Sequence, residues 1–122
     1  MTNNKIRTAV IGLGVGIHHA RTLSAHPDCE LVWLCDLDKG KLAEVNSEAK
    51  QTQNDQDILT NPDIDMVCVS SYDQAHYRQV IQALENGKHV YVEKPMCLTK
   101  NEAKDIRKKL QANPHLRISS NM

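Results

Sequence analysis

Aromatic residues and net charge are both scarce in this chain of 122 residues. It has no phenylalanine, one tryptophan and three tyrosines, so aliphatic side chains must build most of its core. Its 15 Lys and Arg balance 15 Asp and Glu, and no stripe of basic residues stands out. Proteins that bind nucleic acid, or that a polybasic segment holds at a membrane, need such positive charge. We therefore expect no nucleic acid and no membrane among the partners, but a small molecule or another protein.

Metal-binding motifs, paired cysteines and long apolar runs are also missing. The four cysteines are Cys29, Cys35, Cys68 and Cys97. They have no C-x-x-C spacing, and the six histidines have no spacing that converges on a metal. We expect reduced thiols in a cytoplasmic protein without a metal site. The apolar run from Ala9 to Ile17 is too short for a membrane span of about 20 residues, and its glycines and the lack of a cleavage site argue against a signal peptide.

What the sequence does contain is a regular alternation of strand and helix patterns. Strands are predicted at residues 6–11, 30–35, 64–69, 89–93 and 116–119. The first holds a short, mainly apolar run closed by Gly12, which is typical of a strand buried on both faces of a parallel sheet. Helical patterns cover residues 17 to 26, 39–49, 74–86 and 99–112, the last with a capping box at Thr99 and Glu102. One more strand is expected within polar residues 50–57. Right-handed crossovers then predict a single α/β domain, a doubly wound parallel sheet in three α/β/α layers.

A glycine-rich turn joins the first strand to the first helix. Its residues are Gly12, Leu13, Gly14, Val15, Gly16 and Ile17. The backbone N–H groups of such a turn, together with the positive end of the helix, suit a pyrophosphate. The third glycine comes one residue earlier than in the G-x-G-x-x-G fingerprint, so the glycines could also simply permit a tight turn between strand and helix.

Asp36 closes the second strand about 20 residues beyond the glycine turn, where the fingerprint places the carboxylate that binds the adenosine ribose. We expect Asp36 and the neighbouring Leu37 to contact the cofactor, although an exposed turn residue would look the same. Unit charges about 4 Å apart interact by roughly 4 kcal/mol at an effective dielectric constant near 20, so Asp36 would repel a 2′-phosphate. NAD is therefore the predicted cofactor in preference to NADP, with Lys39 and Lys41 close enough in sequence to soften that preference.

Several further motifs accompany Asp36. They are Gly-x-Gly-x-Gly-x-x-His-Ala at residues 12–20, Asp-Met-Val at 65–67, His76, Gly-Lys-His-Val at 87–90 and Glu93-Lys94-Pro95. Together they resemble the N-terminal domain of the Gfo/Idh/MocA oxidoreductases, the family of glucose-fructose oxidoreductase and inositol dehydrogenase. The resemblance covers nearly the whole chain and implies a Rossmann domain. The Glu-Lys-Pro motif is its most specific part.

The resemblance implies roles for these residues. Lys94 is expected to be the catalytic lysine beside the nicotinamide, where an ammonium stabilises the developing alkoxide of the substrate. Glu93 would help to hold the nicotinamide ribose, and Pro95 is commonly cis in the family. The cofactor cleft is further expected to include Ser70, Ser71, Tyr72, His76 and Asn121, with Tyr72 replacing the usual proline or small polar residue.

Family members continue into a second α/β domain that binds the substrate, and no such domain is expected within residues 1–122. The resemblance implies the NAD-binding domain of an oxidoreductase that transfers hydride between nicotinamide and a sugar, polyol or related hydroxyl substrate. Alone it should bind the cofactor with negligible turnover, and a homo-oligomer is possible in a full-length form. Two alternatives remain open: a free-standing dinucleotide-sensing or scaffold module, and a doubly wound domain for another ligand, such as a flavin.

Overall fold

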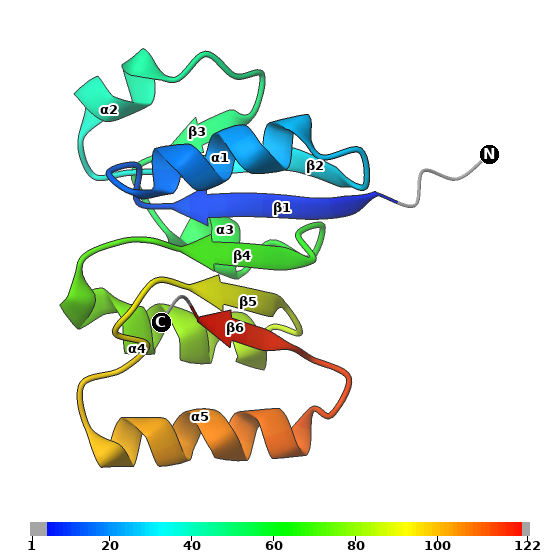
Figure 1. Ribbon diagram of the computed structural model, residues 1–122, viewed down its shortest axis with the longest axis vertical. Helices are drawn as coiled ribbons and strands as arrows, with labels where there is room; N and C mark the ends of the chain where they lie inside the picture. Colours follow the sequence, from blue (N-terminus) through cyan, green and yellow to red (C-terminus); the bar gives the residue numbers. More distant parts are fainter. Residues whose placement is uncertain (1–4, 121–122) are drawn as a thin grey trace.

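A single parallel sheet of six strands organises the computed structural model, which describes residues 5–120 (Figure 1). The strands are β1 (Ile6–Ile11), β2 (Cys29–Cys35), β3 (Lys50–Thr52), β4 (Met66–Val69), β5 (His89–Val92) and β6 (Ile118–Ser120). Their order across the sheet is β3-β2-β1-β4-β5-β6, and every neighbouring pair is parallel. The chain winds outward in one direction from β1 and then in the other from β4. The predicted doubly wound sheet is confirmed, with its switch point between β1 and β4.

Helices cover both faces of this sheet. They are α1 (Gly16–Ala25), α2 (Lys39–Glu44), α3 (Gln56–Leu59), α4 (Asp73–Glu85) and α5 (Lys100–Ala112). Figure 1 shows α1 on one side of the sheet and α4 on the other. Ala20 of α1 belongs to one buried cluster, whereas Val80 of α4 and Ile106 of α5 belong to a second. The three predicted α/β/α layers are therefore present.

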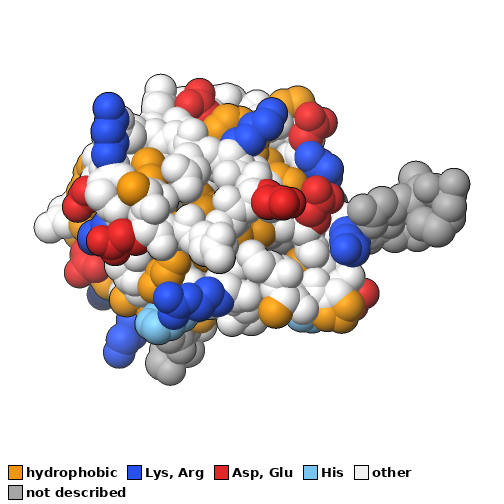
Figure 2. Space-filling model, turned by 90° about the horizontal axis from the view of Figure 1, so that it is seen from above, with side chains coloured by type: hydrophobic (Ala, Val, Ile, Leu, Met, Phe, Trp, Pro, Cys, Tyr) orange, Lys and Arg blue, Asp and Glu red, His pale blue; other side chains and the backbone are white. Residues whose placement is uncertain are grey.

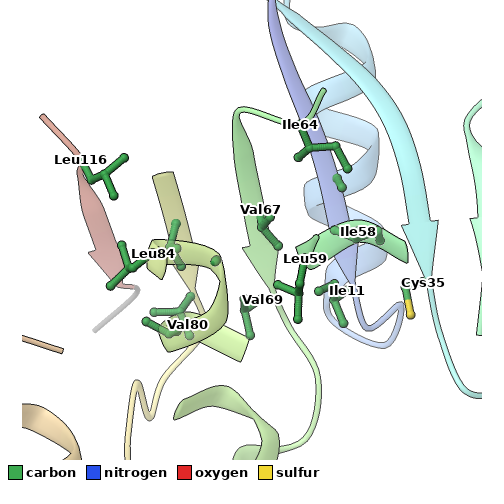
Figure 3. Close-up of a cluster of buried hydrophobic side chains, with 14 of the residues drawn as sticks. Ile11, Cys35, Ile58, Leu59, Ile64, Val67, Val69, Val80, Leu84 and Leu116 are labelled. Atoms are coloured by element: carbon green, nitrogen blue, oxygen red, sulfur yellow. The ribbon is translucent and has the colours of Figure 1, made fainter. Parts of the chain in front are cut away.

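Alternation along the central strands explains why consecutive residues near their carboxyl ends are apolar. Ala9 and Ile11 point into the cluster beneath α4 and α5, whereas Val10 between them points into the cluster beneath α1. In β4, Val67 and Val69 share the first cluster, part of which is drawn in Figure 3. Each fully buried side chain of this kind contributes about 1.5–3 kcal/mol of transfer free energy. This core fixes the carboxyl ends of β1, β2, β4 and β5 along one edge.

Three predicted elements have a boundary that differs from the structure by two residues or more. The helix predicted over 39–49 ends at Glu44, because Val45 is already extended and the Ser47 hydroxyl accepts from the Ala49 N–H, which forms a local turn. The fourth strand begins at Met66 rather than residue 64, since the Ile64 N–H bonds back to the Asn61 carbonyl in a turn. The last strand covers 118–120 rather than 116–119.

The polar segment 50–57 holds the third strand that was expected there. Residues 50–52 pair with the end of β2 at the edge of the sheet. A strand at this position has a neighbouring strand on one side only. The same region also begins α3, which was not predicted. This helix is only four residues long, yet its Ile58 and Leu59 are fully buried. At residues 99–112 the capping box is confirmed, because the Thr99 hydroxyl accepts from the Glu102 N–H at 3.1 Å.

The surface carries charge of both signs. On the face seen in Figure 2, basic and acidic side chains are interspersed with apolar ones. Among residues 5–120, no helix is long and apolar enough to span a membrane. The predicted cofactor contact Asn121 lies outside the described residues.

Candidate dinucleotide-binding site

The carboxyl ends of the strands open into a groove of about 520 Å³, within the usual range for small-molecule sites. Seven of the residues predicted to contact a cofactor line it: Gly12, Gly14, Asp36, Leu37, Ser70, Ser71 and Tyr72. Six polar residues along the groove were not predicted as cofactor contacts: Lys41, Gln53, Asn54, Asp55, Arg78 and Gln79. The groove therefore lies at the switch point, where ligands of doubly wound sheets bind.

The three glycines of the turn differ in what surrounds them. Gly12 has a φ of +93°, and a Cβ there would lie 2.5 Å from the Ser70 backbone. A Cβ on Gly16 would lie 2.9 Å from Val10 Cγ1, so Gly16 allows α1 to pack closely on β1. A Cβ on Gly14 would meet only Lys41 Nζ, at 3.9 Å. These are the fingerprint's three roles, a tight turn, an approach for pyrophosphate and helix packing, although the third glycine comes one residue early.

Helix α1 begins at this turn without a cap of its own. Its N-cap residue, Val15, offers no side-chain acceptor, and the first turn holds no acidic residue. The amides at a helix start need partners from outside the helix, and a negatively charged group is favoured there. A phosphate is the natural ligand of such a helix end.

Asp36 ties the end of β2 to the glycine turn. Its Oδ2 accepts from the Leu13 N–H at 2.7 Å, and its Oδ1 accepts from the Asp38 N–H at 2.8 Å. The carboxylate thus serves as a turn residue and also lines the groove, so the two sequence interpretations of Asp36 are compatible. Leu37 beside it is 69% exposed, which leaves an apolar surface at the groove rim.

A polar network forms the opposite wall. The Ser71 hydroxyl donates to Gln79 Oε1 at 2.5 Å, and Gln79 Nε2 donates to Asp55 Oδ2 at 2.9 Å. Arg78 also donates to Asp55 Oδ2, at 2.7 Å. Burial raises the pKa of the Asp55 carboxyl, but donation from Gln79, Arg78 and Gln56 outweighs burial, so the net pKa is lowered. Asp55 therefore stays ionised and orients Gln79 against the loop that follows β4.

The buried thiols of Cys35 and Cys68 lie near the carboxyl ends of β2 and β4. Burial, reinforced by nearby aspartates, raises the pKa of Cys35 to about 12. Burial also raises the pKa of Cys68 to about 11. Both thiols therefore stay protonated at neutral pH, and nucleophilic chemistry needs the thiolate. All four cysteines are free, as expected.

Glu93, Lys94 and Pro95 follow β5 along the same edge. Glu93 Oε2 lies 2.5 Å from Nε2 of His19, which projects from α1. His19 also meets the Tyr91 ring edge-on at 5.0 Å. Lys94 is exposed, and the bond between Lys94 and Pro95 is cis, as expected. The His19 contact joins the helix after the glycine turn to the Glu-Lys-Pro motif.

His76 lies behind the groove wall. Its side chain is only 1% exposed, and its two ring nitrogens lie 2.7 Å from the carbonyl oxygens of Pro95 and Ser71. Because both nitrogens are occupied, any influence on a ligand must pass through these two loops. Within residues 5–120, no group of three or more His, Cys, Asp or Glu side chains is arranged to hold a metal ion.

The sheet order, the uncapped helix start and the carboxylate at the end of β2 together define a dinucleotide-binding domain of the Rossmann type. The residues present fit such a ligand, because Gly14 leaves space for a pyrophosphate beside the helix start. The model of the GFO/IDH/MocA oxidoreductase family, with its NAD-binding Rossmann fold, matches residues 6–119. The chain belongs to this family.

Known relatives agree with this assignment. The chain is 34% identical over 113 residues to scyllo-inositol 2-dehydrogenase (NAD(+)) of Bacillus subtilis, a match that spans 88% of this chain and 33% of the enzyme. It is 35% identical over 111 residues to D-glucoside 3-dehydrogenase of Escherichia coli, spanning 87% and 32%. The crystal structure of myo-inositol 2-dehydrogenase from Lactobacillus plantarum superposes with a TM-score of 0.87 at 30% identity, spanning 96% of this chain and 36% of that one. The chain thus spans about a third of the length of these relatives.

Proposed function

We propose that residues 1–122 form the NAD-binding domain of an oxidoreductase that transfers hydride between NAD and a hydroxyl-bearing carbon of a sugar, polyol or related substrate. The observation that carries the proposal is the convergence of the glycine turn, Asp36 and the Glu-Lys-Pro motif on one edge of the sheet. The relatives, which include inositol and glucoside dehydrogenases, support the substrate class. A second domain, as in those longer relatives, would hold the substrate.

In this proposal some residues of the chain bind the cofactor and Lys94 acts on the substrate. The amides of the glycine turn bind the pyrophosphate, and Asp36 accepts from the adenosine ribose hydroxyls through lone pairs that the Leu13 and Asp38 N–H groups leave open. Glu93, held by His19, accepts from the nicotinamide ribose. When bound, NAD supplies the hydride acceptor. Lys94, exposed at the end of β5, would hold the substrate hydroxyl and stabilise the negative charge that develops on its oxygen as the hydroxyl proton passes to a base of the second domain; that charge returns to the C=O bond when the carbon gives up its hydride to NAD.

Asp36 and Lys41 have opposite effects on cofactor choice. Asp36 accepts from backbone amides and brings a negative charge to the ribose end of the groove, which disfavours a 2′-phosphate. Lys41 Nζ lies over the glycine turn, 3.9 Å from the place of a Gly14 Cβ. This amine is the cation best placed to reduce the repulsion. We propose that NAD is still preferred, because the carboxylate is held by two hydrogen bonds whereas the lysine is on a flexible stem.

Calorimetric titration with NADH and NADPH tests this proposal. The wild-type chain should bind NADH more tightly than NADPH, and Asp36→Asn should narrow the gap about tenfold, since a tenfold change corresponds to about 1.4 kcal/mol. Lys41→Gln should widen the gap, while Lys108→Gln, an exposed lysine of α5, serves as its matched control. Preferential binding of NADPH by the wild type would contradict the assigned role of Asp36.

Turnover separates the dehydrogenase from the dinucleotide-sensing alternative, because both share this cofactor site. We propose that turnover with a polyol and NAD requires the second domain and is lost in Lys94→Ala of the two-domain protein, with cofactor binding retained. The four free cysteines support a cytoplasmic location for such an enzyme. A homo-oligomer of the two-domain form is also proposed, and light scattering measures it.

A further inference from the structure

Arg78 of α4 lines the groove, and two hydrogen bonds fix the orientation of its guanidinium. Nη2 donates to Asp55 Oδ2 at 2.7 Å, and Nη1 donates to Gln82 Oε1 at 2.9 Å. Gln82 is itself held, since its side-chain amide exchanges hydrogen bonds with that of Gln56 at 2.9 and 3.0 Å. The N–H groups of a guanidinium lie in one plane, so both acceptors bind at its edge and leave its faces for other contacts. The Arg78 side chain is 51% exposed.

This guanidinium lies at the Asp36 end of the groove. Its partner Asp55 follows β3, the strand beside β2 in the sheet. The same segment contacts the residue after Asp36, because Gln53 Nε2 donates to the Leu37 carbonyl at 2.8 Å. The Glu-Lys-Pro motif, by contrast, follows β5 on the other side of β1 and β4. If Asp36 holds the adenosine ribose, the base attached to that ribose lies beside Leu37 and this guanidinium.

The side chains at this end suit a flat, uncharged ring better than a phosphate. Burial raises the pKa of the Asp55 carboxyl, but its hydrogen-bond donors lower the pKa by more, so Asp55 stays ionised and neutralises Arg78. Asp36 adds a further negative charge to the lining. Leu37 and Tyr72 are both exposed there and add apolar surface. A guanidinium face stacks on aromatic rings, and adenine is such a ring.

Resting on the proposed NAD site, we propose that Arg78 is a cofactor-binding residue whose guanidinium face stacks on the adenine ring, with Asp55 and Gln82 holding the guanidinium plane in position. Arg78 belongs to none of the motifs that identify the cofactor site in the sequence. The contact depends on the planar shape of the guanidinium as well as on its charge, so lysine does not replace it. It is independent of the nicotinamide half of the cofactor and of a 2′-phosphate.

Calorimetric titration with ADP-ribose isolates this contact, because ADP-ribose keeps the adenosine and the pyrophosphate of NAD and lacks the nicotinamide. Arg78→Ala should bind ADP-ribose about fivefold more weakly than the wild type, which corresponds to about 1 kcal/mol. NADH and NADPH should lose affinity by the same factor. Arg107→Ala, at an exposed arginine of α5, is the matched control and should bind all three as the wild type does. Unchanged affinity for ADP-ribose in Arg78→Ala, or a larger loss for NADPH than for NADH, would overturn the proposal.

Arg78→Lys separates stacking from charge. Lysine keeps the positive charge and still pairs with Asp55, but it has no planar group. ADP-ribose should therefore bind to Arg78→Lys about as weakly as to Arg78→Ala. Wild-type affinity in Arg78→Lys would show that charge alone is enough, as in a contact with the pyrophosphate, and would contradict stacking.

Side-chain NMR of the wild-type chain detects the stacking directly. Protons that lie over the face of an aromatic ring shift upfield, so the Nε–H signal of Arg78 should move upfield as ADP-ribose saturates the chain. The Nε–H signal of Arg107 should stay in place. Nicotinamide mononucleotide, which has no adenine, should leave both signals unchanged. A downfield shift of the Arg78 signal, as a hydrogen bond to phosphate would give, or no shift at saturation would overturn the proposal.

Failure of the proposed function and failure of this inference give different results. If the wild type binds none of ADP-ribose, NADH and NADPH, both fail. If the wild type binds ADP-ribose and Arg78→Ala binds it equally well, the cofactor site stands and the role of Arg78 fails. If Arg78→Ala does not fold, the NMR titration of the wild type and the affinity of Arg78→Lys decide the proposal.

Discussion

The two ends of the sheet use the same two structural devices with different results. Each end has a glycine with positive φ, Gly12 at +93° and Gly87 at +76°. Each end also has a buried nitrogen-bearing side chain between two backbone carbonyls. At the carboxyl end this is His76, between Ser71 and Pro95. At the amino end it is Lys88, between Asn61 and Ile64. The contacts of these glycines and side chains show that one end of the sheet forms the ligand site and the other stabilises the fold.

Lys88 fastens loops that carry no predicted site residue. Its Nζ donates to the carbonyl oxygens of Asn61 and Ile64, and its side chain is 1% exposed. These carbonyls belong to the turn before β4, at the edge opposite the groove. The glycines differ in the same way, since a Cβ on Gly87 would meet nothing within 4 Å, whereas one on Gly12 would meet the Ser70 backbone. The amino end thus stabilises the domain, and the carboxyl end shapes a ligand site.

Gly12→Ala should have the largest effect. An added Cβ both occupies a left-handed backbone conformation and lies 2.5 Å from the Ser70 backbone, so we expect a loss of about 3 kcal/mol or more in the free energy of unfolding, together with loss of NADH binding. Urea denaturation and calorimetry measure the two effects.

Gly87→Ala is the matched control for that substitution. It carries only the conformational cost of about 1–2 kcal/mol, and NADH binding should remain. Equal losses of unfolding free energy and of NADH binding in Gly12→Ala and Gly87→Ala would contradict the distinction between the two ends of the sheet.

Lys88→Met should lower the free energy of unfolding by about 1–3 kcal/mol, because it leaves the Ile64 and Asn61 carbonyls without their donor. The folded variant should bind NADH with wild-type affinity. Lys108→Met, on an exposed position of α5, controls for loss of a positive charge. A weakening of NADH binding by about tenfold, which corresponds to about 1.4 kcal/mol, would show that the amino end also shapes the site.

The smallest effect is a dependence of stability on pH that should be specific to Lys88. Burial lowers its pKa below 10.5, although Asp65 and Asp63 partly oppose this. Between the lowered pKa of the folded state and 10.5, the unfolded chain binds more protons than the folded one, so the free energy of unfolding rises with pH. From pH 7 towards pH 10, the wild type should therefore gain stability relative to Lys88→Met in urea denaturation. A difference that shrinks over this range would contradict a buried, desolvated amine.

The sheet could be predicted from sequence because both faces of its central strands are buried. Ala9, Val10 and Ile11 of β1 are all apolar for that reason, and the glycine turn and Asp36 follow them at fixed spacings in the sequence. The outermost strand β3 and the helix α3 that follows it were harder to predict. The polar strand at 50–52 buries little, and α3 is too short to show helical periodicity, so Ile58 and Leu59 gave no clear signal.

The candidate site was predicted only where its residues follow a motif. The network of Asp55, Arg78 and Gln79 joins a loop to a helix far along the chain, and no spacing in the sequence reveals such a contact. His76 was expected near the cofactor, yet its two carbonyl partners depend on the relative positions of β4 and β5. The early third glycine left its role open until its packing against Val10 was known.

Amide NMR spectra of the chain during titration with NADH test the central claim most directly, namely that the carboxyl end is the cofactor site. The account predicts saturable shifts of the amides of Leu13, Gly14, Leu37 and Ser71, which lie around the groove, while the amides of Gly87 and Lys88 stay unchanged. Shifts concentrated around Gly87 and Lys88, or no shifts at saturating NADH, would contradict it.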